Sequence, residues 1–377
     1  MAKPFDICIR GAGIVGRTLA LHLAGKRLRV ALTVLPRTAP EASPASDVRA
    51  YALNQAARNL LEGIRCWPDD VHATPVLAMQ VHGDQGGHVS FSAASQGVSA
   101  LNWIVDVPAL ETRLEEAVRF QPLIEVCDVP PPAALTVICE GKASQTRVEL
   151  GVEFTTLPYA QCAVAARVEC TQPHAQTARQ WFHEGEVLAF LPLGGAQGNL
   201  CAIVWSISPE RAQQLLGASA EEFCTALQSA SHNALGSLQL SSPRSSWPLQ
   251  QALAKRWCGQ SAAGAWVLAG DAAHTVHPLA GQGLNLGLGD VAELSRVLDG
   301  RAYWRTVGDP KLLRAYERAR RADFALVNQA GDTLQQLFFH AHPGLQTLRN
   351  WGMNQFERSG PLKHWIAQRA MGAANTI

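Results

Sequence analysis

The sequence predicts a two-lobed α/β protein: a Rossmann-like dinucleotide-binding domain with an inserted antiparallel-sheet domain and a helical C-terminus. Three observations predict this architecture. A glycine motif lies between an apolar strand and a helix near the N-terminus, and a second glycine-rich motif opens a helix after residue 270. Short alternating runs with turn residues fill the region between these motifs. The nucleotide-binding segments are therefore far apart in the sequence, and the second lobe is inserted between them.

Length and composition indicate a well-buried globular enzyme. The chain has 377 residues, which at about 150 residues per domain suggests two or three lobes. Hydrophobic residues make up 47% of the chain and charged residues 17%, a balance that argues against extended disorder. The formal net charge of +1 gives no electrostatic reason to expect nucleic acid as a partner.

The cysteines and the N-terminus indicate a reduced, cytoplasmic protein. Nine cysteines are scattered without any C-x-x-C pair, so we expect neither a disulfide framework nor a metal site. Residues 5–10 already form a predicted strand, which leaves no room for a secretion signal before them. The charge-free stretch at 187–209 is interrupted by Pro192 and Gly194, and we therefore predict no transmembrane segment.

The first part of the chain has the pattern of a βαβ unit. We predict an apolar strand at 5–10, a helix at 14–26 and a second strand at 29–35. A crossover of this kind implies parallel strands with helices packed against the sheet. A loop rich in Pro, Ala and Ser is expected at 36–46, before a helix at 53–63.

The middle of the chain reads as antiparallel sheet. Runs at 79–82 and 88–91 flank Gly86 and Gly87, which predicts a hairpin. Further strands are predicted at 161–170, 179–183, 187–191 and 199–206. Turn residues separate these strands, and we assign them to a second, substrate-facing lobe.

The remaining elements belong to the first lobe. A helix is predicted at 109–120, with Pro108 in its first turn, and a buried strand at 135–139. A last core strand is predicted at 266–269, and the chain is expected to be mostly helical from residue 281. No internal repeat is present.

The N-terminal glycine motif has the context that a dinucleotide site requires. Gly11, Gly13 and Gly16 form G-x-G-x-x-G between a strand and a helix. The first glycine makes the turn, the second lets a pyrophosphate approach the backbone, and the third lets helix and strand pack closely. The helix N-terminus offers N–H groups and a partial positive charge to the phosphates. The alternative is a glycine turn formed for steric reasons alone.

The second motif spans residues 270–285 and follows the strand at 266–269. An aspartate at the strand end, Asp271, can accept hydrogen bonds from a polyol such as ribityl. Gly281 and Gly283 let a ring system lie against the backbone at a helix start, where the helix would stabilise the negative charge of a reduced flavin. The arrangement is improbable as an accident of structure.

Together these motifs resemble the FAD-dependent aromatic hydroxylases of the para-hydroxybenzoate hydroxylase fold. The pattern G-D-A-A-H-x-x-x-P-x-x-G-Q-G-x-N carries the resemblance, and the chain is most similar to the ubiquinone-biosynthesis hydroxylases. Further matching stretches are residues 47–53, 188–193, 316–321 and 361–372. The resemblance covers nearly the whole chain.

The resemblance implies a division into three parts. The FAD-binding domain would comprise residues 1–75, 106–157 and 251–340. The substrate domain would comprise residues 76–105 and 158–250, followed by C-terminal helices at 341–377.

The resemblance also implies a set of cofactor-binding residues. They are Gly11, Gly13, Gly16, Arg49, Asp271, Pro278, Gly281, Gly283, Leu284 and Asn285. The first three would hold the pyrophosphate, Asp271 the ribityl and pyrophosphate region, and Pro278 with residues 281–285 would border the isoalloxazine ring. Arg49 would lie against the cofactor, although an arginine without this context is more often a solvated surface residue.

The implied chemistry is that of a monooxygenase. NAD(P)H, as a transient co-substrate, would reduce the flavin, dioxygen would add at C4a, and the hydroperoxide would hydroxylate a phenolic ring. No residue is an obvious general base, so the catalytic residues stay unassigned. His274 and His277 lie beside the flavin motif, and we favour a structural role over proton transfer. Their spacing is compatible with a metal, but no further ligands cluster nearby and none is predicted.

The chain departs from the family pattern at four places. The second strand ends Thr33-Val34-Leu35-Pro36, without the carboxylate that usually binds the ribose. Glu140-Gly141 stands for the family's D-G, and the segment between residues 120 and 135 is short for a β-meander. Val107 stands where Asn or Gln is expected to face the flavin. These differences predict looser FAD binding, with lost activity as one consequence.

Three other functions remain open at this stage. The chain could be a non-catalytic family member that scaffolds a biosynthetic complex, or a soluble aromatic hydroxylase outside quinone synthesis. A flavin halogenase is less favoured, because no W-x-W-x-I-P stretch is present.

The C-terminal region combines basic and aromatic residues. They are Arg314, Arg318, Arg320, Arg321, Leu337, Phe338, Phe339, Trp351, Phe356 and Trp365. Such a surface could contact a membrane, which suits a polyprenylated substrate, although we favour a helix that packs its apolar stripe on the first lobe. We therefore expect a cytoplasmic protein, with peripheral contact to the inner membrane face or a biosynthetic complex as the alternative.

Overall fold

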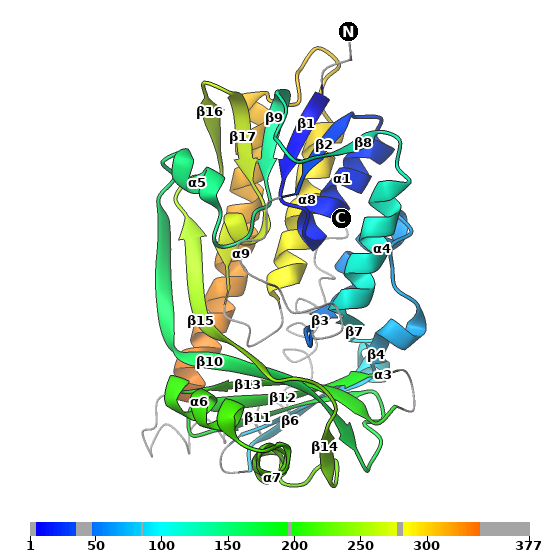
Figure 1. Ribbon diagram of the computed structural model, residues 1–377, viewed down its shortest axis with the longest axis vertical. Helices are drawn as coiled ribbons and strands as arrows, with labels where there is room; N and C mark the ends of the chain where they lie inside the picture. The colour runs from blue at the N-terminus through cyan, green and yellow to red at the C-terminus, as the bar shows by residue number, and fades with distance from the viewer. Residues whose placement is uncertain (1–4, 35–46, 84–85, 195–197, 277–281, 340–377) are drawn as a thin grey trace.

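The computed structural model has two lobes, one at each end of its long axis (Figure 1). It describes residues 5–34, 47–83, 86–194, 198–276 and 282–339, with side chains described as far as residue 329. The exposed loop predicted at 36–46 and the C-terminal helices predicted at 341–377 lie outside the described residues. No helix in the described part of the chain combines the length and apolarity needed to cross a bilayer.

The first lobe is built on a six-stranded sheet. Its order is β16 (Cys258–Ser261), β17 (Gly264–Leu268), β9 (Ala133–Ile138), β1 (Phe5–Arg10), β2 (Val30–Thr33) and β8 (Ile124–Cys127). All neighbouring strands are parallel except β16, which pairs antiparallel with β17. The predicted βαβ opening is therefore confirmed. Between the helix at 107–119 and β9 the structure has a single strand, β8, so no meander is present in this described segment.

Helices cover this sheet because each presents an apolar face to it. They are α1 (Ile14–Gly25), α2 (Gln55–Gly63), α4 (Val107–Arg119), α8 (Gly283–Asp299) and α9 (Pro310–Phe339). Leu19 and Leu23 of α1 are fully buried in one core with Ile7 and Ile9 of β1. Burial of each such side chain contributes about 1.5–3 kcal/mol to stability.

The second lobe is a nine-stranded sheet. Its order is β18 (His274–Thr275), β15 (Ser245–Ala254), β10 (Phe154–Cys170), β13 (Leu200–Ile207), β12 (Glu186–Leu193), β11 (Thr177–His183), β5 (Ala78–His82) and β6 (His88–Ser92), with β14 (Leu238–Leu240) paired to β10. The pairs are antiparallel except β11 with β5. The hairpin predicted around Gly86 is confirmed by the register of Val81 with Val89. Helices α6 (Pro209–Gly217) and α7 (Ala220–Ala230) cover one face, over Phe190 and Trp205.

A small three-stranded sheet joins the two lobes. It consists of β3 (Ala50–Leu53), β7 (Asn102–Asp106) and β4 (Ala73–Val76). Ala50 and Ala52 pack against residues of the large sheet, whereas Tyr51 packs with the core of the first lobe. The short elements are η2 (Asp70–His72), α3 (Ala93–Gln96), α5 (Gln145–Glu149) and η3 (Gly270–Ala272).

Several predicted boundaries differ from the structure, and two of them show the physical reason. The helix predicted at 53–63 begins at Gln55, because Asn54 caps it by accepting a hydrogen bond from the backbone N of Ala57 at 2.9 Å. The strand predicted at 161–170 begins at Phe154, since β10 continues past an irregularity between Pro158 and Cys162 to pair with β15. The first difference reflects a local helix cap, and the second reflects pairing between strands far apart in the sequence.

We predict that the protein loses stability as the pH falls below about 6.5. In the buried His174 ring, Nδ1 accepts a hydrogen bond from the backbone N of Gln176 at 3.0 Å, and Nε2 donates to the Leu193 carbonyl at 2.9 Å. Burial lowers the pKa of His174, so in acid the unfolded chain takes up a proton that the folded ring excludes. Urea unfolding at pH 7.5 and 5.5 should show this loss.

In the His174→Gln variant the difference between the two pH values should shrink. The exposed His183→Gln is the matched control and should keep the difference of the unaltered chain. An unchanged difference in His174→Gln would show that this ring is not responsible.

Candidate functional site

The N-terminal glycine turn is closed on one side and open on the other. Gly11 has φ of 107°, and a Cβ placed on it would overlap the carbonyl oxygen of Cys139. A Cβ on Gly16 would overlap the carbonyl oxygen of Gly11, whereas one on Gly13 meets nothing within 4 Å. Gly11 and Gly16 are therefore required by packing, and Gly13 faces free space.

The start of α1 is suited to an anion. Its N-cap residue, Gly13, has no side chain to accept a hydrogen bond, and the first turn carries no acidic residue. The N–H groups and positive dipole end of the helix are therefore available beside the open position. A pyrophosphate placed there would satisfy both.

The second motif begins where β17 ends. Gly270 has φ of 63° and opens η3, which carries Asp271. Asp271 is solvent-exposed, yet the surrounding protein desolvates its carboxyl and raises its pKa, an effect that His274 and Lys142 partly offset. Both observations fit a carboxyl in a recess that water and a small molecule can enter.

The two glycine motifs meet at one side chain, Val15 in the first turn of α1. A Cβ on Gly270 would lie 3.3 Å from Val15 Cγ2, and one on Gly287 of α8 would lie 2.8 Å from the same atom. The turn at residues 11–16, the strand end at 270 and helix α8 are therefore packed together, as the sequence predicted for a single cofactor site.

The start of α8 also faces free space. A Cβ on Gly283 meets nothing within 4 Å, and the N-cap residue Gln282 offers no side-chain cap. Leu284 is partly buried against the core of the first lobe. The other ring-bordering residues of the prediction, Pro278 and Gly281, lie outside the described residues, as does His277.

Asn285 connects the second motif to the joining sheet. Its Nδ2 donates to the carbonyl of Ala52 at 2.8 Å, and its Oδ1 accepts from the backbone N of Asn54 at 3.0 Å. The amide thus binds the backbone where β3 passes into α2. Its geometry supports a role in fixing β3 against α8, while contact with a flavin stays a prediction.

Arg49 and Tyr51 belong to the same strand region. Arg49 Nη2 and Nε bind the Asp47 carboxylate at 2.6 and 2.9 Å, and Nη2 lies 3.6 Å from Glu111. Hydrogen bonding to Asp47 raises the pKa of Arg49. Tyr51 packs against the core of the first lobe. Arg49 is therefore held in an ion-paired cluster on the segment that leads into β3.

Behind the site lies a buried charged cluster that the sequence analysis missed. The Asp290 carboxylate of α8 is fully buried and accepts at 2.7 Å from Gly270 N, from His274 Nε2 and from Arg320 Nε of α9. Arg320 Nη2 also donates to the carbonyl of Leu286 at 3.0 Å. We call Asp290, His274 and Arg320 the buried triad.

The Asp290 carboxylate of the buried triad is paired on both of its oxygens. Burial alone would raise the pKa of Asp290, but His274 and Arg320 hold it below its usual value. His274 is 2% exposed and stacks on Trp257 with ring centroids 4.8 Å apart. Its contacts support the structural role favoured from the sequence. The available signal in the sequence was a single carboxylate, Asp290, inside the otherwise apolar run of residues 286–292.

The departures from the family pattern have local explanations. The Glu140 carboxylate is buried and lies 3.0 Å from Arg10 Nε, while it accepts from Ser144 Oγ at 2.7 Å and from Thr146 N at 3.0 Å. The longer side chain thus ties β1 to the start of α5. Val107 is fully buried in the first-lobe core and presents no polar group.

The end of β2 lacks a carboxylate in the described residues. Thr33 is 1% exposed, and its hydroxyl lies 3.8 Å from Cys8 Sγ. The sequence predicted that the carboxylate that usually binds the ribose is missing here, and the described residues of this strand supply no replacement.

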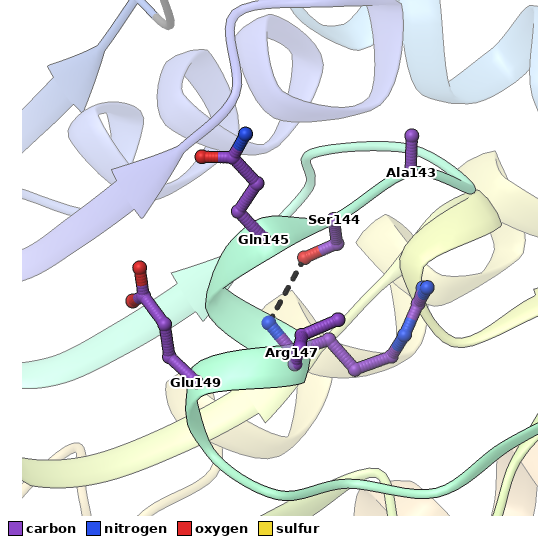
Figure 2. Close-up of a pocket in the computed structure, with 6 residues that line it drawn as sticks. Ala143, Ser144, Gln145, Arg147 and Glu149 are labelled. Atoms are coloured by element: carbon purple, nitrogen blue, oxygen red, sulfur yellow. Dashed lines mark hydrogen bonds between the residues drawn. The ribbon is translucent and has the colours of Figure 1, made fainter.

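A shallow depression surrounds α5, as Figure 2 shows. It is lined by Ala143, Ser144, Gln145, Arg147, Val148 and Glu149. Ser144 Oγ accepts from the backbone N of Arg147 at 3.1 Å. The Arg147 guanidinium is occupied by the carbonyls of Ala272 at 3.0 Å and Lys142 at 2.8 Å, and it lies 3.5 Å from the Phe154 ring. This segment supports the site from outside and is not the site itself.

One ion pair joins the lobes beside the site. Arg167 of β10 binds the two carboxylate oxygens of Asp106 at 2.9 and 3.1 Å, and it donates to the carbonyl of Asp47 at 3.3 Å. It thereby fixes the segment that carries Arg49.

In the described parts of the chain no group of three or more His, Cys, Asp or Glu side chains could hold a metal ion.

These features fit FAD. Gly13 and Gly283 leave free space at two uncapped helix starts, which suit a pyrophosphate and an electron-rich ring. Asp271 supplies an acceptor for a polyol between them. The chemistry of the donor set therefore agrees with the dinucleotide that the sequence predicted.

Comparison with known proteins agrees with this geometry. Residues 132–330 match the family model described as an FAD binding domain. A ubiquinone hydroxylase of Rhodospirillum rubrum is 32% identical, over 98% of this chain and 90% of the relative. The 3-demethoxyubiquinol 3-hydroxylase of Escherichia coli is 30% identical, over 98% of this chain and 99% of the relative. The crystal structure of p-nitrophenol 4-monooxygenase from Pseudomonas putida shares the fold, with a TM-score of 0.74 at 17% identity, covering 98% of this chain and 99% of that one.

We predict that substitutions at two glycines of the first motif affect different properties, stability at one and FAD binding at the other. Gly16→Ala should destabilise the cofactor-free protein by about 1–3 kcal/mol, because its Cβ overlaps backbone. Gly13→Ala should change that stability by less than about 1 kcal/mol and weaken FAD binding instead. Urea unfolding and flavin fluorescence titration measure the two quantities. Equal destabilisation by both variants would contradict the assignment.

We predict that the buried triad dominates local stability. Asp290→Asn removes the charge that pairs with Arg320 and should cost about 3–5 kcal/mol of unfolding free energy. The control is Asp299→Asn, whose partner Lys26 is exposed, so its cost should stay below about 1 kcal/mol. If urea unfolding shows a similar loss of unfolding free energy in both variants, the buried triad contributes no more to stability than an exposed ion pair.

Proposed function

The chain belongs to the FAD-binding-domain family that includes the ubiquinone hydroxylases, and we propose on this premise that it hydroxylates a phenolic ring with NAD(P)H as reductant. The activity is an FAD-dependent hydroxylation in ubiquinone biosynthesis. The observation that carries the proposal is the packing of both glycine motifs around Val15, which leaves Gly13 and Gly283 open.

Different residues of the chain would bind different parts of the cofactor. The N–H groups at the start of α1 would bind the pyrophosphate, and Asp271 would accept hydrogen bonds from the ribityl chain. The start of α8 would stabilise negative charge on the ring. FAD, when bound, supplies the redox chemistry that activates dioxygen.

The large sheet offers a surface for the substrate. On the face away from α6 and α7, Ala165 of β10 pairs with Val204 of β13, which pairs with Ala189 of β12. These small apolar side chains would leave room for a flat ring and exclude water from it. They support a phenolic, polyprenylated substrate that reaches the cofactor between the lobes.

NAD(P)H would bind only transiently. The described part of the chain contains one strand–glycine–helix motif of the dinucleotide type, at residues 5–25, and that motif is assigned to FAD. The nicotinamide would therefore approach the flavin from solvent. Contact with a membrane stays a prediction, because its aromatic residues beyond 339 lie outside the described residues.

One observation favours a second candidate. The end of β2 carries no ribose carboxylate in the described residues, and Val107 presents no polar group, which would suit a family member that scaffolds a biosynthetic complex. The open helix starts at Gly13 and Gly283 and the exposed Asp271 weigh more heavily, because a scaffold would not need them.

We predict that the purified protein binds FAD and shows the yellow flavin spectrum. A phenolic substrate should then accelerate NAD(P)H oxidation and acquire one oxygen atom from labelled dioxygen. The control omits the phenol and measures uncoupled oxidation. If the purified protein is colourless and added FAD does not restore the flavin spectrum, the enzyme proposal is wrong and the scaffold is favoured.

A further inference from the structure

Arg167 reaches from the second lobe toward the first. Alternate residues of a strand face opposite sides of the sheet. Val164, Ala166 and Val168 of β10 pack in the core beneath α6 and α7, so the Arg167 side chain faces the other way, toward the three-stranded sheet. The backbone N of Arg167 donates to Ser242 Oγ at 2.7 Å, which fixes the point from which the side chain starts.

The Asp106 carboxylate binds Arg167 and does not cap a helix. Asp106 ends β7 and is the N-cap residue of α4, a position where an aspartate side chain commonly accepts from the helix backbone. Its side chain makes no such bond, and its two oxygens accept from Arg167 Nη1 and Nη2 at 3.1 and 2.9 Å. The two side chains are 18% and 17% exposed. This use of the carboxylate indicates a role in joining the lobes.

The same guanidinium also binds the segment before β3. Arg167 Nη2 donates to the carbonyl of Asp47 at 3.3 Å. The Asp47 carboxylate in turn accepts from the backbone N of Arg49 at 3.0 Å and from its Nη2 at 2.6 Å. The carbonyl of Arg49 accepts from the backbone N of Val107, next to Asp106, at 3.3 Å. The backbone and the side chain of Arg49 are therefore both tied to residues that Arg167 holds.

Arg49 keeps hydrogen-bond donors for a ligand. Its side chain is 43% exposed, and a guanidinium has five N–H donors, of which Asp47 uses only some. The strand that follows is held to the start of α8 by Asn285, which donates to the carbonyl of Ala52 at 2.8 Å. The segment is thus fixed by the second lobe at one end and by the second glycine motif at the other. A long side chain that is already ordered loses less conformational entropy when a ligand binds.

We propose that Arg167 is a positioning residue for FAD: from the second lobe it holds residues 47–49, so that the Arg49 guanidinium is ordered before the cofactor binds. This role rests on the proposed function and on the predicted contact between Arg49 and FAD. Cofactor affinity then depends on a residue that does not itself contact the cofactor and lies in the lobe that offers the substrate surface.

The test is a double-mutant cycle in which flavin fluorescence measures the Kd for FAD. Arg167→Gln should raise the Kd about three- to tenfold, because Arg49 must then be ordered during binding. Arg49→Gln should raise the Kd at least as much, and adding Arg167→Gln to it should cause little further change. The matched control is Arg211→Gln, whose guanidinium pairs with Glu186 at 3.1 Å within the second lobe and should leave the Kd unchanged.

Thermal melting of the cofactor-free proteins checks that each variant folds like the unaltered chain. If Arg167→Gln does not fold, Arg167→Lys takes its place in the cycle. Lysine keeps the positive charge beside Asp106 but lacks the planar fork that binds two carboxylate oxygens and the Asp47 carbonyl together. It should therefore raise the Kd in the same direction by a smaller factor.

Each other outcome overturns a defined claim. An unchanged Kd in Arg167→Gln would refute the positioning role. If the two substitutions multiply their effects in the combined variant, Arg167 acts independently of Arg49, as a general weakening of the lobe contact would, and the positioning role is wrong. An unchanged Kd in Arg49→Gln would refute the positioning role and leave the proposed function standing. An unaltered chain that does not bind FAD would refute both.

Discussion

The buried Asp290 carboxylate is the interaction on which the site depends. It joins three elements at one point: η3 through Gly270 N, β18 through His274, and α9 through Arg320. A buried carboxylate without partners would be strongly destabilising, so the three donors must all be in place when the chain folds. The strand end that carries Asp271 is therefore held rigidly behind the recess.

The second motif belongs to both lobes. The residues after Asp271 form β18, which pairs with β15 of the large sheet, so the second motif starts in one lobe and enters the other. Arg167 binds Asp106 and the Asp47 carbonyl from the second lobe. A substrate on the large sheet and a cofactor on the glycine turns would therefore face each other across a connected framework.

The departures from the family pattern act on different parts of this framework. Glu140 keeps a carboxylate in its position and uses its extra length to pair with Arg10 and the start of α5. Val107 and the end of β2 lack the polar side chains that the family pattern has there, and the described residues at these two positions supply no others. The residues proposed to hold the phosphates and the ribityl chain are thus kept, whereas polar groups are missing where the ribose and the flavin ring would lie.

The sequence alone determined the glycine turns, Asp271, the open βαβ unit and the antiparallel character of the second lobe. These features follow from backbone conformation and spacing over a few residues, which local sequence encodes. Only the tertiary structure decided that Arg320 pairs with Asp290 across 30 residues, that Arg167 pairs with Asp106 across 61, and that Asn285 binds the backbone at Ala52 across 233. Such partners depend on strand register and on which face of a helix or strand packs inward, and short-range patterns do not specify either one.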